Sequence, residues 1–297
     1  MKMILPNANS IATFDGVIPK KNDLPYFRKE KQNYCSMLTN NGDSNYMMLN
    51  ETGNLIMNLC TGSNSVQDIL KQMQNMFPEI AENTLFEDIV KVLHTLTQSN
   101  AISWRNKDMI YANPFCFMAS DTFSDECTFS LVMEYEIRET VAYIKDAIAN
   151  KKNEKDFLLY IWGTNHREYG NPVVVRQCLY SYYRDFFVLK SRGRIAGVII
   201  VQPATDVFLN EATIQMIALP SEFIEPSLKS IMDYYGTFPF KKINLLRIQL
   251  PIDFCESTPK FVKLIDAIGF SLESLQKGAY LNKDLYSYSA NLDTDEK

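Results

Sequence analysis

The spacing of apolar positions changes near Asn50, and this change predicts strands followed by helices. Before Asn50, apolar and polar residues form runs of strand length, and the Asn-Asn-Gly-Asp sequence at 40–43 is typical of a hairpin turn. After Asn50, apolar residues recur every three or four positions, which is the period of an amphipathic helix. We therefore expect strands at 26–28, 34–38 and 45–49, helices at 51–60, 66–77 and 83–98, and a last strand at 101–104.

Capping residues support these helix ends. Asn50 and Ser65 each precede a helical run, and their side chains can accept hydrogen bonds from the free N–H groups of a first turn. Gly62 lies where a left-handed C-terminal cap is needed, and Pro78 ends the second helix. The resulting order, β-β-β-α-α-α-β, is typical of a small winged helix-turn-helix domain.

From Phe129 onward, strand-like alternation and helical spacing take turns, which predicts a second α+β domain. The expected order is β-α-α-β-β-β-α-β-α-β-β. Strands are expected at 129–136, 186–189, 195–202, 207–219, 243–250, 279–281 and 285–288, and helices near 141–148, 173–183, 226–235 and 259–268.

Two segments show no such spacing and contain turn-forming residues instead. They divide the chain into an N-terminal arm at 1–24, a first domain at 25–106, a linker at 107–128 and a second domain at 129–297.

The composition agrees with two folded domains and excludes several classes of protein. The 297 residues are 46% hydrophobic, which is enough to build two cores. Two histidines, and six cysteines without a Cys-x-x-Cys pair, leave no candidate metal site. No apolar run approaches the roughly 20 residues that span a bilayer, and no secretory signal is visible. We therefore expect a cytoplasmic protein with no membrane span.

A winged helix-turn-helix often binds DNA, but the charges of this one argue against it. Residues 25–106 carry six Lys or Arg against eight Asp or Glu. The third helix, which would enter the major groove, carries Glu82, Glu87 and Asp88 against the single lysine Lys91. Such a surface would repel phosphates, so no nucleic-acid partner is expected.

The first domain resembles the PqqD-like proteins. The resemblance lies in Leu49-Asn50-Glu51-Thr52-Gly53 and Leu59-Cys60-Thr61-Gly62, and it continues through residues 65–70 and 88–90. This family is the leader-peptide recognition element of pathways for ribosomally made, post-translationally modified peptides (RiPPs). The resemblance implies that a precursor peptide is the partner.

It also implies how the peptide binds. The leader would pair with the exposed third strand and lie in a groove against the third helix. The implied peptide-binding residues are Asn45, Tyr46, Met47, Met48 and Leu49 on the strand, and Asp88 and Lys91 on the helix.

The second domain resembles the GCN5-related N-acyltransferases (GNAT), which have a mixed, mainly antiparallel sheet with flanking helices. The resemblance covers residues 129–291 and lies in Arg194–Gly197, Ile217–Pro220, Ala267–Phe270 and the closing hairpin at 277–288. It implies an N-acyltransferase whose donor is acyl-CoA or another acyl thioester.

The sequence departs from the GNAT pattern at the donor site. The family's Gln/Arg-x-x-Gly-x-Gly/Ala loop is replaced by Phe223–Leu228, which lacks both glycines and contains Glu225. The usual tyrosine acid and asparagine of the fourth helix align with Ile265 and Thr258. Three interpretations remain: another acyl carrier, CoA held by a rearranged loop, or a domain kept as a binding scaffold.

Candidate catalytic residues remain. Glu211 begins a polar row with Thr213 and Gln215 and is the candidate general base; a solvated charge is the equal alternative. Tyr280, Tyr286 and Tyr288 in the closing hairpin are candidate acids, and tyrosines with a surface or core role are the alternative. By resemblance, donor binding would use backbone amides of Ile217 and Leu219, if a strand bulge is present, together with Ser221 and Ser227 of the following loop.

The leading hypothesis is therefore a RiPP maturation N-acyltransferase. Its first domain would hold the leader, and its second would transfer an acyl group to an amine of the core peptide. The alternative is a non-catalytic adaptor that presents the peptide to partner enzymes. A DNA-binding regulator is a third hypothesis, disfavoured by the acidic helix, and a homodimer is left open.

Overall fold

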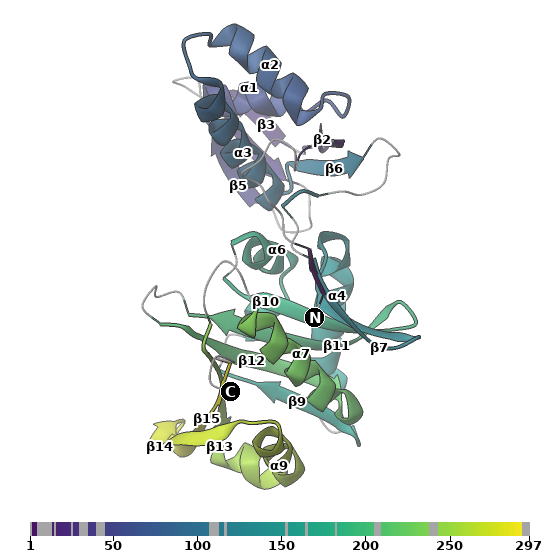
Figure 1. Cartoon of the computed structure of the whole chain (residues 1–297), viewed down its shortest axis with the longest axis vertical. Coiled ribbons are helices and arrows are strands. Elements are labelled where there is room, and N and C mark those ends of the chain that lie inside the picture. The colour runs from purple at the N-terminus through teal and green to yellow at the C-terminus, as the bar shows by residue number, and fades with distance from the viewer. Residues whose placement is uncertain are drawn as a thin grey trace. The chain divides into compact units, whose positions relative to one another are not determined.

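The computed structural model of the chain forms two compact units, each with its own strands and helices (Figure 1). Leu5–Phe117 is the N-terminal unit, and Met118–Lys297 together with Met1–Ile4 is the C-terminal unit. The structure describes residues 2–4, 14, 16–24, 26–29, 35–39, 45–106, 113–115, 118–151, 154–163, 166–181, 183–204, 209–237 and 243–292.

The N-terminal unit has an antiparallel sheet followed by helices, in the order that the sequence predicts. The apolar face of each helix is buried, as the side chains of Ile56, Ile69 and Ile89 illustrate. The elements are β3 (Tyr26–Lys29), β4 (Cys35–Thr39), β5 (Asn45–Leu49), α1 (Glu51–Leu59), α2 (Val66–Met76) and α3 (Glu82–Gln98).

Capping residues hold the helix ends as predicted. The Asn50 side chain accepts a hydrogen bond of 2.8 Å from the Gly53 amide, and Ser65 forms a capping box with Asp68. Gly62 has φ +83°, the left-handed conformation expected after α1. These contacts satisfy backbone groups that the ends of a helix leave without helical partners.

The segment expected to be an arm contributes strands instead. In the N-terminal unit, β2 (Val17–Lys21) pairs with β6 (Ile102–Asn106). The strand β6 therefore pairs with residues that precede the first domain's expected start, and the winged helix-turn-helix is not confirmed. An aromatic cluster holds this region together: Phe14, Phe86, Trp104 and Phe115.

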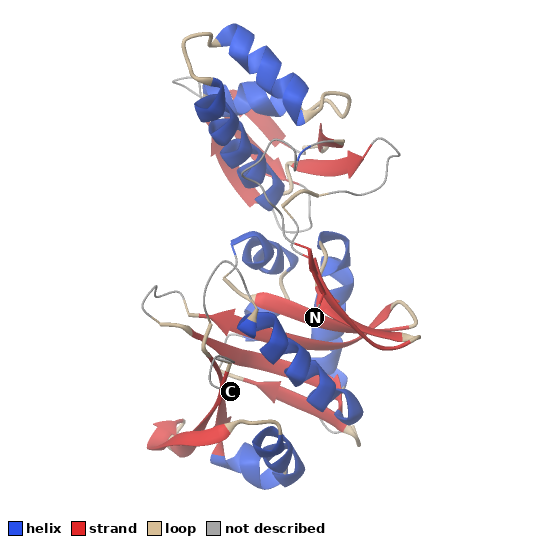
Figure 2. Ribbon diagram, in the orientation of Figure 1, coloured by secondary structure: helices blue, strands red, loops and turns tan. Residues whose placement is uncertain are grey.

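The C-terminal unit is built on a mixed sheet (Figure 2). Its strands are β1 (Lys2–Ile4), β7 (Met118–Ser124), β8 (Cys127–Leu131), β9 (Phe157–Ile161), β10 (Asp185–Ser191), β11 (Arg194–Pro203), β12 (Glu211–Pro220), β13 (Leu245–Pro251), β14 (Ser271–Tyr280) and β15 (Lys283–Asn291). They lie in the order β1-β7-β8-β10-β11-β12-β13-β15-β14, with β9 against β12. Among the described pairs only β12 and β13 run parallel, which confirms the expected α+β, mainly antiparallel fold.

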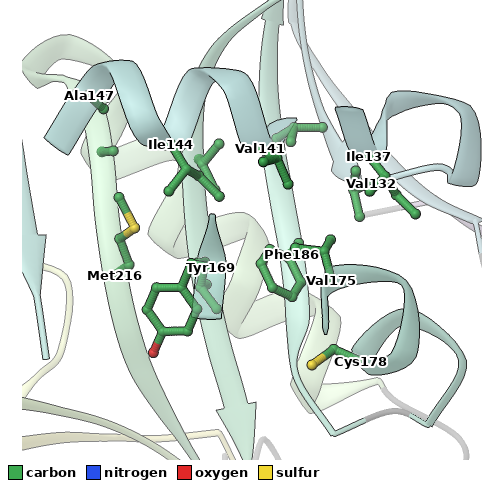
Figure 3. Packing of buried hydrophobic residues seen from close by; sticks show 14 residues of the cluster. Val132, Ile137, Val141, Ile144, Ala147, Tyr169, Val175, Cys178, Phe186 and Met216 are labelled. Carbon is green, nitrogen blue, oxygen red and sulfur yellow. The ribbon is translucent and has the colours of Figure 1, made fainter. Parts of the chain in front are cut away.

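Helices cover both faces of this sheet. Side chains of α4, α5 and α6 pack on the face that carries Phe186 (Figure 3). On the opposite face, Phe187 contacts Tyr234 of α7 with ring centroids 5.2 Å apart. The helices are η3 (Glu134–Glu136), α4 (Ile137–Asn150), α5 (His166–Tyr169), α6 (Pro172–Ser181), η4 (Ser221–Phe223), α7 (Ile224–Gly236), α8 (Ile252–Ser257) and α9 (Pro259–Ala267).

Two features of this unit differ from expectation. The strand β7 and the start of β8 lie inside the segment 107–128 that was expected to be a linker, and β1 adds the first residues of the chain to β7. The strand β9 has no counterpart in the expected order, and it changes the donor site described below. Among the described residues, no helix has the length and apolar character needed to cross a bilayer.

Candidate functional sites

The outer side of β5 is the candidate peptide-binding site. In the described residues the sheet has the order β3-β4-β5, and β5 pairs with β4 alone. All five predicted strand residues, Asn45 to Leu49, lie in this ladder. Within the described part of the chain, the other side of β5 therefore presents backbone N–H and C=O groups at an edge, where an extended peptide can add as a further strand.

Successive side chains of β5 point to opposite faces of the sheet, as strand geometry requires. Leu49 is buried beside Gly53 at the start of α1, whereas the Met48 side chain is 52% exposed. Because α1 follows β5 directly and is capped by Asn50, the end of the strand is fixed to the helical layer. Met48 is thus accessible to a peptide bound along β5.

Asp88 and Lys91 lie on the solvent-exposed side of α3. Their charged groups form an ion pair of 3.3 Å, one helical turn apart. The apolar side of α3, with Ile89 and Leu93, is buried in the core. An ion pair this exposed adds little to stability, so both side chains can exchange partners readily.

The strands β12 and β13 separate after a short parallel pairing. Glu211–Thr213 pair with Leu245–Arg247, and beyond them β12 pairs with β9 over Met216–Pro220. The opposite side of β12 is already occupied by β11. The strand β9 therefore takes the side of β12 that β13 has left.

The bulge on which the predicted donor amides depend is present. Ile200 pairs with Met216, but Val201 pairs with Ile214, so Gln215 has no partner on β11. A bulge turns backbone groups of the strand away from the regular ladder. Here the carbonyl oxygen of Gln215 accepts a hydrogen bond of 2.7 Å from the Trp162 amide, just after β9.

The amides of Ile217 and Leu219 point toward β9. At one end of this pairing Gln215 bonds to Trp162, and at the other the Ser221 amide donates to the residue that precedes β9, at 2.8 Å. In an antiparallel ladder, alternate residues direct their amides to the same neighbour. The register places Tyr160 opposite Ile217 and Leu158 opposite Leu219. The backbone donors expected for a thioester carbonyl thus face a strand of the chain itself.

Side chains hold β9 in this position. The Tyr160 hydroxyl donates a hydrogen bond of 2.6 Å to the Gln249 carbonyl on β13, so β9 bridges the two separated strands. Burial raises the pKa of Tyr160 well above its ordinary value, which keeps the hydroxyl protonated as a donor. Just beyond the strand, Trp162 stacks on Tyr280 with ring centroids 5.3 Å apart.

The loop after β12 does not fit the pyrophosphate of an acyl-CoA. The Ser221 amide is already bonded, and Ser227 is fully buried within α7. Glu222 and Glu225 place two acids in the first turns, and the nearby Lys229 pairs with Glu225 at 2.8 Å. An anion site needs a positive or neutral surrounding, which the acids of this loop do not offer.

The candidate base Glu211 belongs to an ion-pair cluster. Its carboxylate accepts a hydrogen bond of 2.5 Å from Arg247, whose guanidinium also binds both oxygens of Glu273 at 2.9 and 3.0 Å. Burial opposes the charge of Arg247, but the hydrogen bonds and charges of Glu273 and Glu211 raise its pKa. Glu211 therefore serves in this structure as an anchor between β12 and β13.

The candidate acid Tyr286 does not lie beside Glu211. Glu211 pairs with Leu245 and Tyr286 pairs with Leu250, so they lie toward opposite ends of β13, roughly 16 Å apart along the strand. Tyr280 stacks on Trp162 instead. Glu211 and Tyr286 therefore do not form a single catalytic group.

No metal centre is found in the part of the chain that the structure describes. Within it, no group of three or more His, Cys, Asp or Glu side chains could hold an ion. His94 packs its ring edge-on against Phe115, with centroids 5.1 Å apart.

A comparison with protein families supports the interpretation of the first domain as PqqD-like. Residues 35–102 match the family model of Coenzyme PQQ synthesis protein D (PqqD). This segment is PqqD-like. The match begins at β4 and ends at β6, so it contains β5, the three helices and both predicted contact regions. A comparison with curated protein sequences finds no match.

Solved structures similar to this chain include N-acetyltransferases. RimL, a ribosomal L7/L12 alpha-N-protein acetyltransferase, is 17% identical over 59% of this chain and 94% of its own, with a TM-score of 0.43. The ribosomal-protein-S5-alanine acetyltransferase of Vibrio fischeri is 14% identical over 60% and 100%, with a TM-score of 0.45. A variant of the spermidine N-acetyltransferase SpeG of Vibrio cholerae is 14% identical over 57% and 95%, with a TM-score of 0.43. The second unit is GNAT-like in the order of its own strands.

Outside the PqqD-like segment, two features were not predicted from the sequence: the strand β9 and a buried pair of polar side chains. The run Phe-Leu-Leu-Tyr-Ile of β9 carried a signal, because it is apolar, of strand length and followed by Gly163. The buried pair Asp185 and Tyr235, joined by a hydrogen bond of 2.6 Å, carried none, because its partners are fifty residues apart.

Proposed function

We propose that the protein binds the leader of a ribosomally made precursor peptide along the outer side of β5 and takes part in the maturation of that peptide. The observation that carries this proposal is the edge of β5 inside the PqqD-like segment, which has no strand partner among the described residues. A leader added there would complete backbone hydrogen bonds, and its alternate side chains would lie beside Met48.

Exposed methionines on two different elements provide a matched test. Met48 on β5 is 52% exposed and Met76 at the end of α2 is 49% exposed. Truncating Met48 removes a cross-strand contact of roughly 0.5–1 kcal/mol, within the range of such pairs, so Met48→Ala should raise the Kd for the leader about two- to fivefold. Met76→Ala should leave the Kd unchanged, as measured by fluorescence anisotropy with a labelled leader peptide. Equal Kd values for both variants would contradict binding along β5.

For the C-terminal unit, a non-catalytic adaptor is the better supported function. The amides of Ile217 and Leu219 face β9, the loop after β12 is acidic, and Glu211 is engaged by Arg247. A bound leader would raise the local concentration of the core peptide for a partner enzyme without any chemistry on this chain.

The GNAT-like strand order favours a second candidate, N-acyl transfer to an amine of the core peptide. The two functions are separated by incubating the full chain with precursor peptide and acetyl-CoA and measuring the peptide mass. An adaptor leaves the mass unchanged. A transferase adds one acyl group and loses rate in Glu211→Gln while keeping its affinity for the leader.

A further inference from the structure

The strands β12 and β13 separate beyond their short parallel pairing. Two parallel strands that separate leave one row of backbone donors and acceptors on each without a strand partner. On β12 this row begins after Thr213, where the pairing with Arg247 ends. A ligand with amide groups could complete such a row, and so could another strand.

Here the chain itself completes the row. The strand β9 pairs with β12 from Met216 to Pro220, and backbone bonds continue the pairing beyond both ends of β9. The Tyr160 hydroxyl closes the other side by bonding to the Gln249 carbonyl of β13. Both walls of the opening are thus bonded to a single internal strand.

Moreover, β9 is packed on both of its faces. Phe157, Leu159 and Ile161 pack against the core that α4 to α6 form on the sheet. On the other face Leu158 is buried, and Tyr160, 1% exposed, contacts Phe254 of α8 with ring centroids 5.3 Å apart. One face of β9 is buried and the other is partly buried, so the strand packs against the unit on both sides.

We infer that β9 permanently occupies the cleft in which an acyl-CoA donor would lie, and that the C-terminal unit does not bind acyl-CoA there. The acids Glu222 and Glu225, in the first turns after β12, act in the same direction, because they repel the phosphates of CoA. This inference concerns β9 and β12, and it is independent of leader binding by β5.

Calorimetric titration of the full chain with acetyl-CoA and with CoA tests the inference. We expect no saturable binding up to about 1 mM ligand, which corresponds to a Kd weaker than about 1 mM. A Kd in the micromolar range would overturn it. Titration of the same preparation with leader peptide reports separately on the proposed function, so failure of one does not imply failure of the other.

Amide hydrogen exchange tests whether β9 stays paired with β12 when acetyl-CoA is present. With acetyl-CoA at about 1 mM, the amides of Phe157–Ile161, and of Ile217 and Leu219, should keep their protection unchanged. Loss of protection at Phe157–Ile161 on adding acetyl-CoA would identify β9 as a displaceable plug and overturn the inference.

A conservative variant extends the test. Tyr160→Phe removes the hydrogen bond to Gln249 but keeps the ring, so β9 should exchange faster while the protein still fails to bind acetyl-CoA. The matched control is Tyr143→Phe on α4. It removes a comparable hydrogen bond of 2.6 Å from the tyrosine hydroxyl to the Ala196 carbonyl on β11. If Tyr160→Phe alone gained saturable acetyl-CoA binding, the occupation of the cleft would not be permanent.

Discussion

At the scale of single residues, the fold shifts the pKa of Asp185. This residue lies at the start of β10, is almost fully buried, and accepts a hydrogen bond of 2.6 Å from the Tyr235 hydroxyl. Burial raises its pKa from 3.8 to about 6, although the bond from Tyr235 acts in the opposite direction. The folded protein therefore holds a proton at Asp185 that the unfolded chain releases at lower pH.

This shift makes the stability depend on pH with a defined sign. Because the folded pKa lies above the unfolded one, the contribution of Asp185 is fully present below about pH 4 and is lost as the pH rises through about 6. Compared with Asp185→Asn, the natural protein should lose roughly 2–3 kcal/mol of unfolding free energy between pH 4 and pH 7. Urea unfolding at several pH values measures this, with the exposed Asp146→Asn as control. A difference that does not change with pH would contradict the account.

At the scale of elements, the close approach of β11 and β12 depends on Gly197. A methyl group at this position would overlap the Leu219 side chain and would lie 3.2 Å from Leu189 Cβ and 3.3 Å from the Ala218 carbonyl oxygen. Leu189 Cβ and the Ala218 carbonyl belong to strands on both sides of β11, so these two neighbours are held in place by the sheet. The glycine is therefore required by packing and not by backbone conformation.

We expect Gly197→Ala to lower the unfolding free energy by about 1–3 kcal/mol, as overpacking in a core does. The matched control is Gly236→Ala in α7, where the nearest neighbour is the Leu292 carbonyl oxygen at 3.5 Å. This control should be neutral or slightly stabilising. Denaturant midpoints of the two variants measure the difference, and equal midpoints would show that the two strands can separate to accept the methyl group.

The elements also show how far the sequence predicts this fold. Helices with strong local signals, such as α2 with its Ser65 cap, were predicted to within a residue or two. The strands β1, β2 and β9 were missed because each is short and is stabilised by a partner distant in the chain. The donor residues were assigned by resemblance, which could not reveal that β9 lies against Ile217 and Leu219. Local patterns predict elements, whereas the contents of a cleft depend on tertiary pairing.

At the scale of the whole molecule, the two units differ in whether backbone groups of a strand are open to a partner. The N-terminal unit offers a free strand edge in its described residues, whereas the C-terminal unit has closed the opening between β12 and β13 with its own strand. We therefore expect peptide binding to reside in the first unit. The second unit would act on the tethered core peptide or present it to a partner.

Hydrogen exchange of the full chain with and without the leader peptide is the most direct test of this account. The leader should slow amide exchange within Asn45–Leu49 of β5, because outward-facing amides gain strand partners, and leave β9 unchanged. Unchanged exchange in β5 at saturating leader, or protection of the opposite edge at Tyr26–Lys29 instead, would contradict leader binding along β5.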